Sequence, residues 1–199
     1  MKKKYLKIFL LASPFYLKGR SADKLHHLVV AKMMEAILKE NPKLDSDVMM
    51  AVALLHDIGY AKIPKQKIGS FWAKKVKKDH MRIGAGLARN ILGKINFPQG
   101  KIDRVCEIIA THDNPELGLP IYSYEARVLK EADILWMTTE EAFWLDIGRR
   151  QIQPEEWLST LEKRFSKDPE YKPYVKTKFG KGRVRNFLRQ MRKKLRGQP

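Results

Sequence analysis

The stretch Ala51-Val52-Ala53-Leu54-Leu55-His56-Asp57-Ile58-Gly59 decides how the rest of the chain is interpreted. Its apolar run ends in an adjacent imidazole and carboxylate, which a buried segment does not usually carry. Burying either group without a partner costs several kcal/mol. A metal ion would satisfy both, because neutral imidazole and carboxylate together suit Zn, Fe, Mn or Ni. For an isolated His-Asp pair, however, a satisfied core histidine or a helix cap is the commoner explanation.

The positions of the other histidines favour the metal interpretation. The chain has five histidines, and four of them recur in apolar helical patterns separated by about a helix and a loop. His26 and His27 open the first pattern, His80 begins the third, and His112 closes the fourth. Asp133 follows in the next apolar segment.

This order of His, His-Asp, two single histidines and Asp resembles the HD superfamily of metal-dependent phosphohydrolases. The resemblance covers about residues 23–135. His26 through Ala31 matches the first motif of that family, Leu54 to Gly59 its signature, and His80-x-x-x-Gly84-Ala85 its third motif. The resemblance implies a site for two divalent metal ions, with Fe expected first and Mn, Ni, Zn or Mg as alternatives. In that site Asp57 would bridge the metals, His26, His56 and Asp133 would complete one position, and His80 and His112 the other.

Hydrophobic periodicity predicts an all-α protein with a basic C-terminal helix, and the resemblance implies that the rest is an HD-domain helical bundle. No period-two alternation of useful length predicts a strand, and no internal repeat is found. We expect one HD domain over residues 1–165 and a basic helical extension over 166–199, packed on it or trailing from it. The expected helices span about residues 24–40, 48–56, 80–92 and 102–112, with further helices around Asp133, from 140 and from 154.

The N-terminus has the outline of a secretory signal, but Lys7 interrupts its apolar part and no small-x-small cleavage site follows. We expect a helix of the mature domain instead, with Leu6, Phe9, Leu10 and Leu17 on one inward face. Gly84 and Gly86 would permit close approach to the helix that ends in His56.

Composition limits the partners and the compartment. The net charge of +18 predicts attraction to phosphate-rich ligands, nucleic acid or an anionic membrane surface, and says nothing about the fold. The single cysteine, Cys106, excludes an internal disulfide and fits a reducing compartment, so we expect a cytoplasmic protein. No stretch reaches the ~20 uninterrupted apolar residues that a spanning helix requires.

Residues 62–78 contain seven lysines and no acidic residue. A charge run is usually a solvated face, but this one lies between two proposed ligand positions and is expected near the rim of the site. Lys62, Lys65 and Arg82 are candidate phosphate contacts. His27 is expected to be exposed or to contact substrate. Phe71 and Trp72 would stack on a base or pack the loop. Asp113 would be an extra ligand or a helix cap, and we favour the cap.

The C-terminal part, residues 172–199, contains eleven Lys or Arg and no Asp or Glu. Its apolar residues recur at helical spacing, which predicts a basic amphipathic helix with an inward face of Val184, Phe187, Leu188, Met191 and Leu195. Either this helix packs on the domain with a solvated charged side, or it contacts nucleic acid or an anionic membrane surface.

The resemblance favours hydrolysis of an anionic phosphate ester, with a nucleotide as the first expectation, through metal-activated hydroxide at a dinuclear site. The single histidines and short intervals are closer to the branch that hydrolyses symmetrical dinucleoside tetraphosphates than to the cyclic-dinucleotide phosphodiesterases, whose His-His pair and Gly-Tyr-Pro motif are missing. A mixed-valent di-iron oxygenase of the same superfamily is one alternative. A non-catalytic nucleic-acid-binding protein with a structural metal site is the other.

Overall fold

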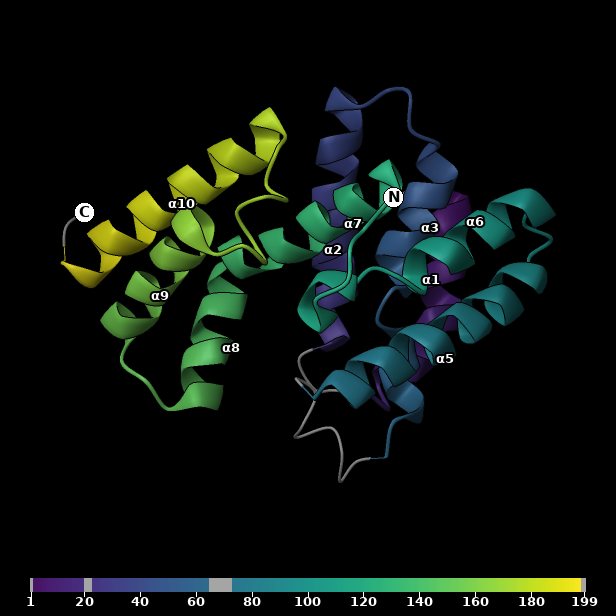
Figure 1. Cartoon of the computed structure of the whole chain (residues 1–199), viewed down its shortest axis with the longest axis horizontal. Coiled ribbons are helices and arrows are strands. Elements are labelled where there is room, and N and C mark those ends of the chain that lie inside the picture. The colour runs from purple at the N-terminus through teal and green to yellow at the C-terminus, as the bar shows by residue number, and fades with distance from the viewer. Residues whose placement is uncertain (1, 20–22, 65–72, 198–199) are drawn as a thin grey trace.

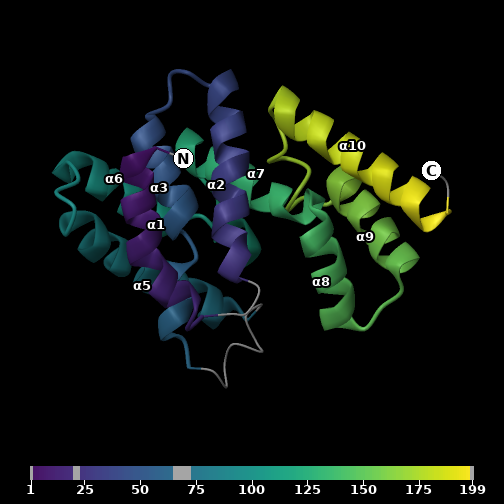
Figure 2. The same ribbon diagram turned by 180° about the vertical axis from the view of Figure 1, so that it is seen from behind.

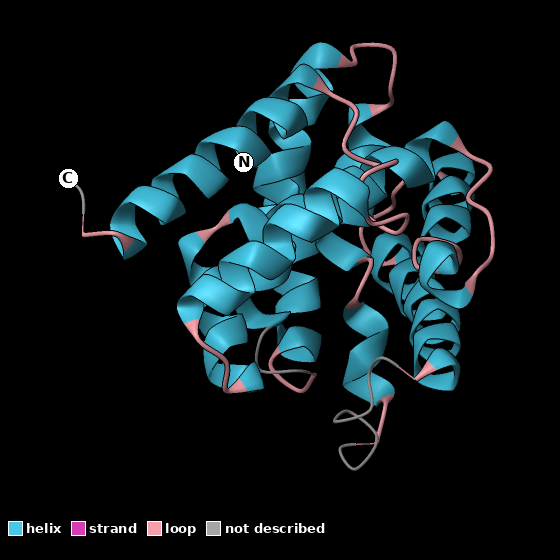
Figure 3. Cartoon of the chain, turned by 60° about the vertical axis from the view of Figure 1, so that its left-hand side comes forward, coloured by secondary structure: helices cyan, strands magenta, loops and turns pink. Residues whose placement is uncertain are grey.

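Helices make up the regular secondary structure of this chain. The computed structural model describes residues 2–19, 23–64 and 73–197, and these ranges contain no strand (Figure 3). The all-α prediction is confirmed. The elements before the last three helices are α1 (Lys3–Tyr16), α2 (Asp23–Glu40), α3 (Ser46–Leu55), the 3₁₀ turn η1 (Ile58–Lys62), α5 (Lys74–Gly93), α6 (Gln99–Ile109), the 3₁₀ turn η2 (Asn114–Leu117), α7 (Tyr124–Ile134) and the 3₁₀ turn η3 (Leu135–Thr138).

Helix α3 is the centre of the main hydrophobic core. Every residue from Val48 to Leu55 is buried, as expected for a helix that is apolar on all sides. Helices α1, α2, α6 and α7 all pack against it. The Asp45 carboxylate caps its N-terminus by accepting from the backbone N–H groups of Asp47 and Val48, at 2.8 and 3.3 Å. The other end of α3 therefore delivers His56 to the interior of the molecule.

Helix α1 forms as predicted, but of the four residues predicted on its inward face only Phe9 packs against the core. Leu6, Leu10 and Leu17 are 43%, 59% and 67% exposed. The fully buried residues of α1 are instead Tyr5, Ile8, Ala12 and Tyr16. The two tyrosines decide the orientation, because each ring is buried while its hydroxyl finds an acceptor. Tyr5 donates to the Asp47 carboxylate at 2.8 Å and Tyr16 to the Leu54 carbonyl at 2.9 Å.

A second hydrophobic cluster lies at the C-terminal side of the molecule. It is formed by α8 (Glu140–Arg150), α9 (Pro154–Lys167) and α10 (Lys178–Leu195). Figures 1 and 2 show these helices on one side, with α2 and α7 between them and the α1, α3, α5 and α6 group. In α10, Phe187 and Met191 are buried, Leu188 and Leu195 are partly buried in the same cluster, and Val184 packs against the main core. The C-terminal helix is therefore packed on the molecule; the proposed boundary at 165/166 stays a prediction.

Two helix boundaries differ from the predicted ones, and both affect the site. Helix α5 begins at Lys74, so the second half of the lysine-rich segment is helical and only part of it faces solvent. Helix α6 ends at Ile109, so His112 lies in the turn that follows it. Cys106 is buried, with its thiol donating to the Ala85 carbonyl at 3.3 Å.

None of the helices in the described ranges combines the length and the apolar character needed to cross a bilayer.

Candidate metal centre

Three of the predicted ligands meet where α2, α3 and α7 come together. His26 lies on α2, His56 directly follows α3, and Asp133 lies near the end of α7. The Nε2 atoms of His26 and His56 are 3.1 Å apart, and the Asp133 Oδ1 atom lies 3.0 and 3.6 Å from them. Both imidazoles are buried, and the Asp133 carboxylate is 19% exposed. These three side chains can offer donor atoms to one cation.

The other three meet beside them, on the side of α5 and the turn after α6. The Nε2 atoms of His80 and His112 are 3.3 Å apart, and each is 3.5 Å from the Asp57 Oδ1 atom. The second oxygen of Asp57, Oδ2, faces the first group at 3.5 Å from His26 Nε2 and 3.7 Å from His56 Nε2. One carboxylate thus presents one oxygen to each trio of residues.

Two glycines let the backbone carry these side chains so close together. A Cβ at Gly59 would lie 1.9 Å from the carbonyl oxygen of His80, so any side chain there would push η1 away from α5. A Cβ at Gly84 would lie 3.4 Å from the His56 carbonyl oxygen, which fits the predicted close approach of this helix to the His56 segment. Gly86 does not share the role, because nothing lies within 4 Å of a Cβ built there.

Backbone carbonyls fix the orientation of two of the rings. The Nδ1–H of His56 donates to the Ala53 carbonyl at 3.2 Å, and the Nδ1–H of His112 donates to the Ile109 carbonyl at 2.7 Å. Because a carbonyl can only accept, the proton is held on Nδ1, and Nε2 is the nitrogen that each ring directs to the shared centre. Tyr60 stacks on His80 with ring centroids 4.1 Å apart.

The charges around the centre favour a cation within it. Burial acts to lower the pKa of His56, but the nearby carboxylates of Asp57 and Asp133 outweigh it and raise this pKa to about 9. Burial acts to raise the pKa of Asp133, but its hydrogen bonds to His26 and His56 keep that pKa well below its usual value. Within each trio the three donor atoms lie within 4.8 Å of one another. Imidazole nitrogen and carboxylate oxygen at this spacing suit divalent transition metals.

An ion-pair cluster that we did not predict adjoins the metal centre. The Lys77 ammonium contacts Asp113 and Glu116 at 2.7 and 2.5 Å, and the Lys130 ammonium contacts the same two carboxylates at 3.0 and 2.7 Å. Lys77, Asp113 and Lys130 are at most 6% exposed. The cluster touches both trios, because Asp113 Oδ2 is 3.5 Å from His80 Nε2 and Lys130 Nζ is 3.7 Å from Asp133 Oδ2.

This cluster corrects two interpretations made from the sequence. Asp113 is not a helix cap, since its side chain makes no cap hydrogen bond at the start of η2. Burial opposes its ionisation, but Lys130 and Lys77 hold the pKa of its carboxyl well below the usual range. Lys77 is not part of a solvated basic face, whereas Lys74, Lys75 and Lys78 are exposed. The sequence held one sign of this cluster, because Lys130 lies three residues before Asp133 in an apolar helix.

The predicted substrate contacts lie in different places. Lys62, at the end of η1, and Arg82, whose side chain is 75% exposed, border one surface hollow of about 310 Å³. His27 is not exposed. It is 2% exposed, and its ring stacks on Tyr16 at 3.9 Å and lies 5.6 Å from the Phe9 ring. The reason is that the Tyr16 side of α1 covers this face of α2. Lys65, Phe71 and Trp72 lie outside the described residues.

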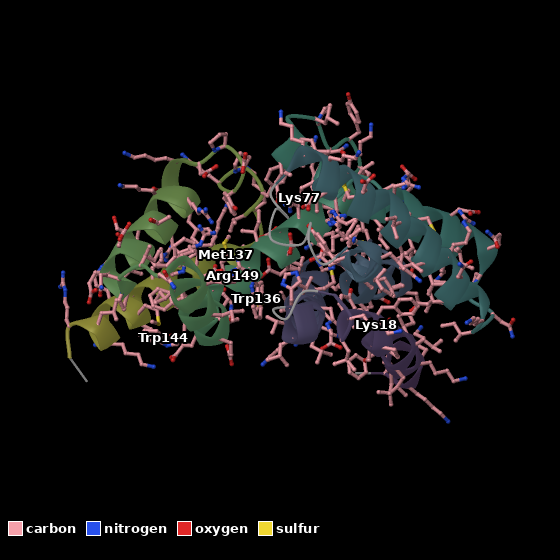
Figure 4. The ribbon with its side chains drawn as sticks, turned by 90° about the horizontal axis from the view of Figure 1, so that it is seen from below. Lys18, Lys77, Trp136, Met137, Trp144 and Arg149 are labelled. Carbon is pink, nitrogen blue, oxygen red and sulfur yellow. The ribbon has the colours of Figure 1, made fainter. Side chains whose placement is uncertain are left out.

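An aromatic side chain borders the centre at the junction with the C-terminal helices. Trp136 of η3 is half-buried and sets its ring at 87° to the His26 ring, with centroids 5.3 Å apart. Figure 4 shows Trp136, Met137 and Arg149 toward this junction, with Lys77 on the side of α5. Neither Trp136 nor Arg149 was predicted as a site residue. From the sequence alone, a tryptophan that follows an apolar helix is interpreted as part of the core.

Comparison with known proteins identifies a family. The family model described as HD domain matches residues 25–138, which is more than half of the chain. All six residues of the two trios lie within that match. Searches of curated proteins and of solved structures gave no match.

Proposed function

The chain belongs to the HD-domain family, whose members are mostly metal-dependent phosphohydrolases, and on this premise we propose that it hydrolyses an anionic phosphate ester, with a nucleotide as the first candidate. The proposed catalyst is a pair of divalent metal ions. His26, His56 and Asp133 would hold one ion, His80 and His112 the other, and Asp57 would bridge them. Iron is the first expectation, with Mn, Ni, Zn or Mg as alternatives.

The observation that carries this proposal is the position of the Asp57 carboxylate. Its two oxygens face different trios, at 3.5 Å from His26 on one side and 3.5 Å from His80 and His112 on the other. A purely structural single-metal site would not require a carboxylate with both oxygens engaged in this way. Bridging carboxylates are typical of paired metals that act on phosphate groups.

When bound, such metals lower the pKa of water and neutralise charge on phosphoryl oxygens. The residues of this chain prepare the site for that chemistry. The Nδ1 hydrogen bonds of His56 and His112 orient both rings so that Nε2 would be the nitrogen offered to a metal. Lys130 lies against the Asp133 carboxylate of the first trio, and Asp113 lies against the His80 ring of the second. The same ion-pair cluster therefore supports one residue of each trio. The tightly buried His56, His80 and His112 rings exclude water from the protein side of the centre.

Substrate recognition would combine charge with one aromatic surface. Lys62 and Arg82 stay candidate phosphate contacts, although their hollow borders the outer side of α5. At the junction with α8, the half-buried Trp136 ring could stack on a nucleobase beside His26, and the exposed Arg149 guanidinium could meet a phosphate. This arrangement favours a nucleotide over a simple phosphate monoester.

The decisive experiment measures metal content and turnover together. Purified protein is analysed for bound metal and assayed for phosphate release or phosphodiester cleavage on a generic phosphodiester and a nucleotide panel. Asp57→Asn keeps the shape of the side chain, and we expect metal content to fall and turnover to drop about a hundredfold or more. The matched control is Asp103→Asn on the exposed side of α6, which should change neither.

Two outcomes would contradict the proposal. Full metal content in Asp57→Asn would exclude the bridge. Bound iron with oxygen consumption and without phosphate release would assign the chain to oxygenase chemistry, for which the same six side chains could serve as ligands.

A further inference from the structure

The outward side of α10 and the loop before it form a cationic surface distant in sequence from the metal centre. Residues 172–196 contain no acidic side chain. Two of their cations are paired with other helices, Arg192 with Glu162 and Lys194 with Glu140. The exposed cations for which the structure gives no carboxylate partner among the described residues are Lys172, Lys176, Lys178, Lys181, Arg185, Arg189, Lys193 and Arg196. We call these eight the α10 cation surface.

The spacing of these charges gives the surface a direction. Lys181, Arg185, Arg189 and Lys193 follow one another at intervals of four residues, so they lie along one side of the helix. Helix α10 is 18 residues long, which corresponds to about 27 Å. A rigid row of cations of this length matches an extended polyanion better than a small anion.

The apolar side of α10 decides between the two polyanions that a basic helix can meet. A helix that inserts into a membrane surface needs a free apolar face. Here that face is occupied, because Phe187 and Met191 are 5% and 1% exposed in the cluster with α9. The exposed side carries cations and polar residues such as Asn186 and Gln190. The surface therefore suits a nucleic-acid backbone, which binds through its phosphates.

A hollow of about 520 Å³ lies beside the cations and adds a place for a base. Its lining is mostly apolar, with Phe165, Pro173, Val175 and Val184, and its rim carries cations of the α10 surface: Lys172, Lys176, Lys181 and Arg185. An apolar recess with a cationic rim fits a nucleotide whose base is unstacked and whose phosphates remain outside. Single strands offer such bases, while duplexes keep them paired.

We propose that the α10 cation surface binds single-stranded nucleic acid, with consecutive phosphates along Lys181, Arg185 and Arg189 and one base in the Phe165 hollow. This binding surface is separate from the proposed hydrolytic centre and does not depend on it. Its recognition is electrostatic along the helix and apolar in the hollow, so it should tolerate different sequences.

Fluorescence anisotropy with a labelled oligothymidylate long enough to span α10 tests the electrostatic part. We expect Lys181→Gln/Arg185→Gln/Arg189→Gln to lower the affinity about tenfold or more and to reduce the slope of log affinity against log salt by about 2. The matched control is Lys3→Gln/Lys7→Gln/Lys94→Gln, which removes the same charge from three exposed lysines elsewhere, two of them around another hollow. Equal losses in the two variants would show that net charge alone attracts the strand, and would overturn the proposal.

The hollow is tested by Phe165→Leu, which removes the ring but keeps an apolar side chain packed against the C-terminal cluster. We expect about tenfold weaker binding to the single strand with an unchanged salt slope, and no change for a duplex of equal length. Tighter binding of the wild type to the duplex would contradict the base-in-hollow arrangement.

A third measurement uses vesicles of phosphatidylcholine and phosphatidylserine. The surface would be assigned to membranes instead if the wild type bound these vesicles but no nucleic acid, and if Lys181→Gln/Arg185→Gln/Arg189→Gln abolished the vesicle binding. Metal content and turnover of the small phosphodiester, measured on the same variants, distinguish a failure here from a failure of the proposed hydrolysis.

Discussion

At the scale of single residues, the chain buries several ionisable groups next to opposite charges. Lys77 and Lys130 are balanced by Asp113 and Glu116, and the carboxylates at the metal centre are balanced by imidazoles. Such a cluster contributes little net stability relative to an apolar core, but removing one partner leaves a buried charge without compensation. What it provides here is position, because it holds Asp133 from one side and His80 from the other.

Replacing one lysine of this cluster should therefore be costly. We expect Lys130→Met to lower the free energy of unfolding by about 3–5 kcal/mol, because Asp113 and Glu116 then share a single cation. Urea denaturation of the metal-free protein measures this change in the free energy of unfolding. Lys39→Met on the exposed side of α2 is the control. The double variant Lys130→Met/Glu116→Gln should recover part of the loss, since Asp113 and Lys77 remain as one pair. A double variant less stable than Lys130→Met would show that the cluster acts only as a whole.

At the scale of the elements, the site depends on how closely helices and turns approach each other. The contact between η1 and α5 is the tightest, with the backbone of Gly59 against the His80 carbonyl. Helix α1 is held to the core differently, through Tyr5, Lys4 and Asp47 at the start of α3. Lys101 of α6 joins the same carboxylate at 3.2 Å. The first contact positions metal ligands, and the second closes the far end of the bundle.

Two glycines, Gly59 in η1 and Gly86 in α5, give a matched pair of predictions about this contact. Gly59→Ala should destabilise the protein and lower metal content, because its Cβ meets the His80 carbonyl at 1.9 Å and one trio must move. Gly86→Ala, in helix α5, has open space around its Cβ and should stabilise the protein by up to about 1 kcal/mol. Thermal unfolding and metal analysis of both variants check this. A neutral Gly59→Ala would mean that η1 and α5 can separate without cost.

The Asp47 contact predicts a pH dependence of stability. Burial acts to raise the pKa of Asp47, but hydrogen bonds from Lys4, Tyr5 and Lys101 lower it to about 2, from 3.8 in the unfolded chain. A lowered folded pKa contributes stability that is complete above about pH 4 and is lost as the pH falls through about 2. Asp47→Asn should thus be less stable than the wild type at neutral pH, by about 0.5–1 kcal/mol for a solvent-screened pair.

Urea unfolding of both proteins from neutral pH down to about 2, after removal of metal, tests this. The gap between wild type and Asp47→Asn should close between about pH 4 and 2. A gap that stays constant over that window would show that the Asp47 ion pairs contribute nothing to folding.

At the scale of the whole molecule, η3 connects the two largest hydrophobic clusters of the described residues. The larger cluster surrounds α3 and supports the metal centre, while the smaller one consists of apolar faces of α8, α9 and α10 (Figure 1). The excess of positive charge is distributed unevenly, with the acid-free residues 172–199 at one end. The molecule can therefore carry a hydrolytic centre in one part and a cationic surface in the other.

Loosening the smaller cluster should leave the larger one intact. Phe187→Ala removes a buried ring from α10 and should cost the C-terminal cluster about 3–5 kcal/mol. Hydrogen exchange followed by mass spectrometry should show faster exchange in α8, α9 and α10 and unchanged protection in α3. The control Gln190→Ala lies on the exposed side of the same helix and should change neither. Faster exchange in α3 as well would show that the two clusters unfold as one unit.

The sequence by itself determined the all-α fold class and most helix positions. It also indicated that imidazole and carboxylate groups meet at the candidate metal centre. Periodic apolar residues must face a common side, so α2, α3, α9 and α10 could be predicted from spacing alone. The order of histidines and aspartates indicated a family because imidazole and carboxylate in apolar helices need a shared partner. That the six side chains converge is borne out by the distances; that they hold metal is still a prediction.

Only the tertiary structure decided which neighbour each residue meets. Spacing shows which residues share a face of a helix, but not which other element covers that face. Helix α1 turned its tyrosines inward, which buried His27 and left Leu10 and Leu17 exposed. Lys77, Asp113 and Lys130 come from segments far apart in sequence, and they are buried together because their charges cancel only when α5, α7 and the turn after α6 are packed. That cancellation is a property of the assembled fold, and the local pattern could show only that Lys130 lies in an apolar helix.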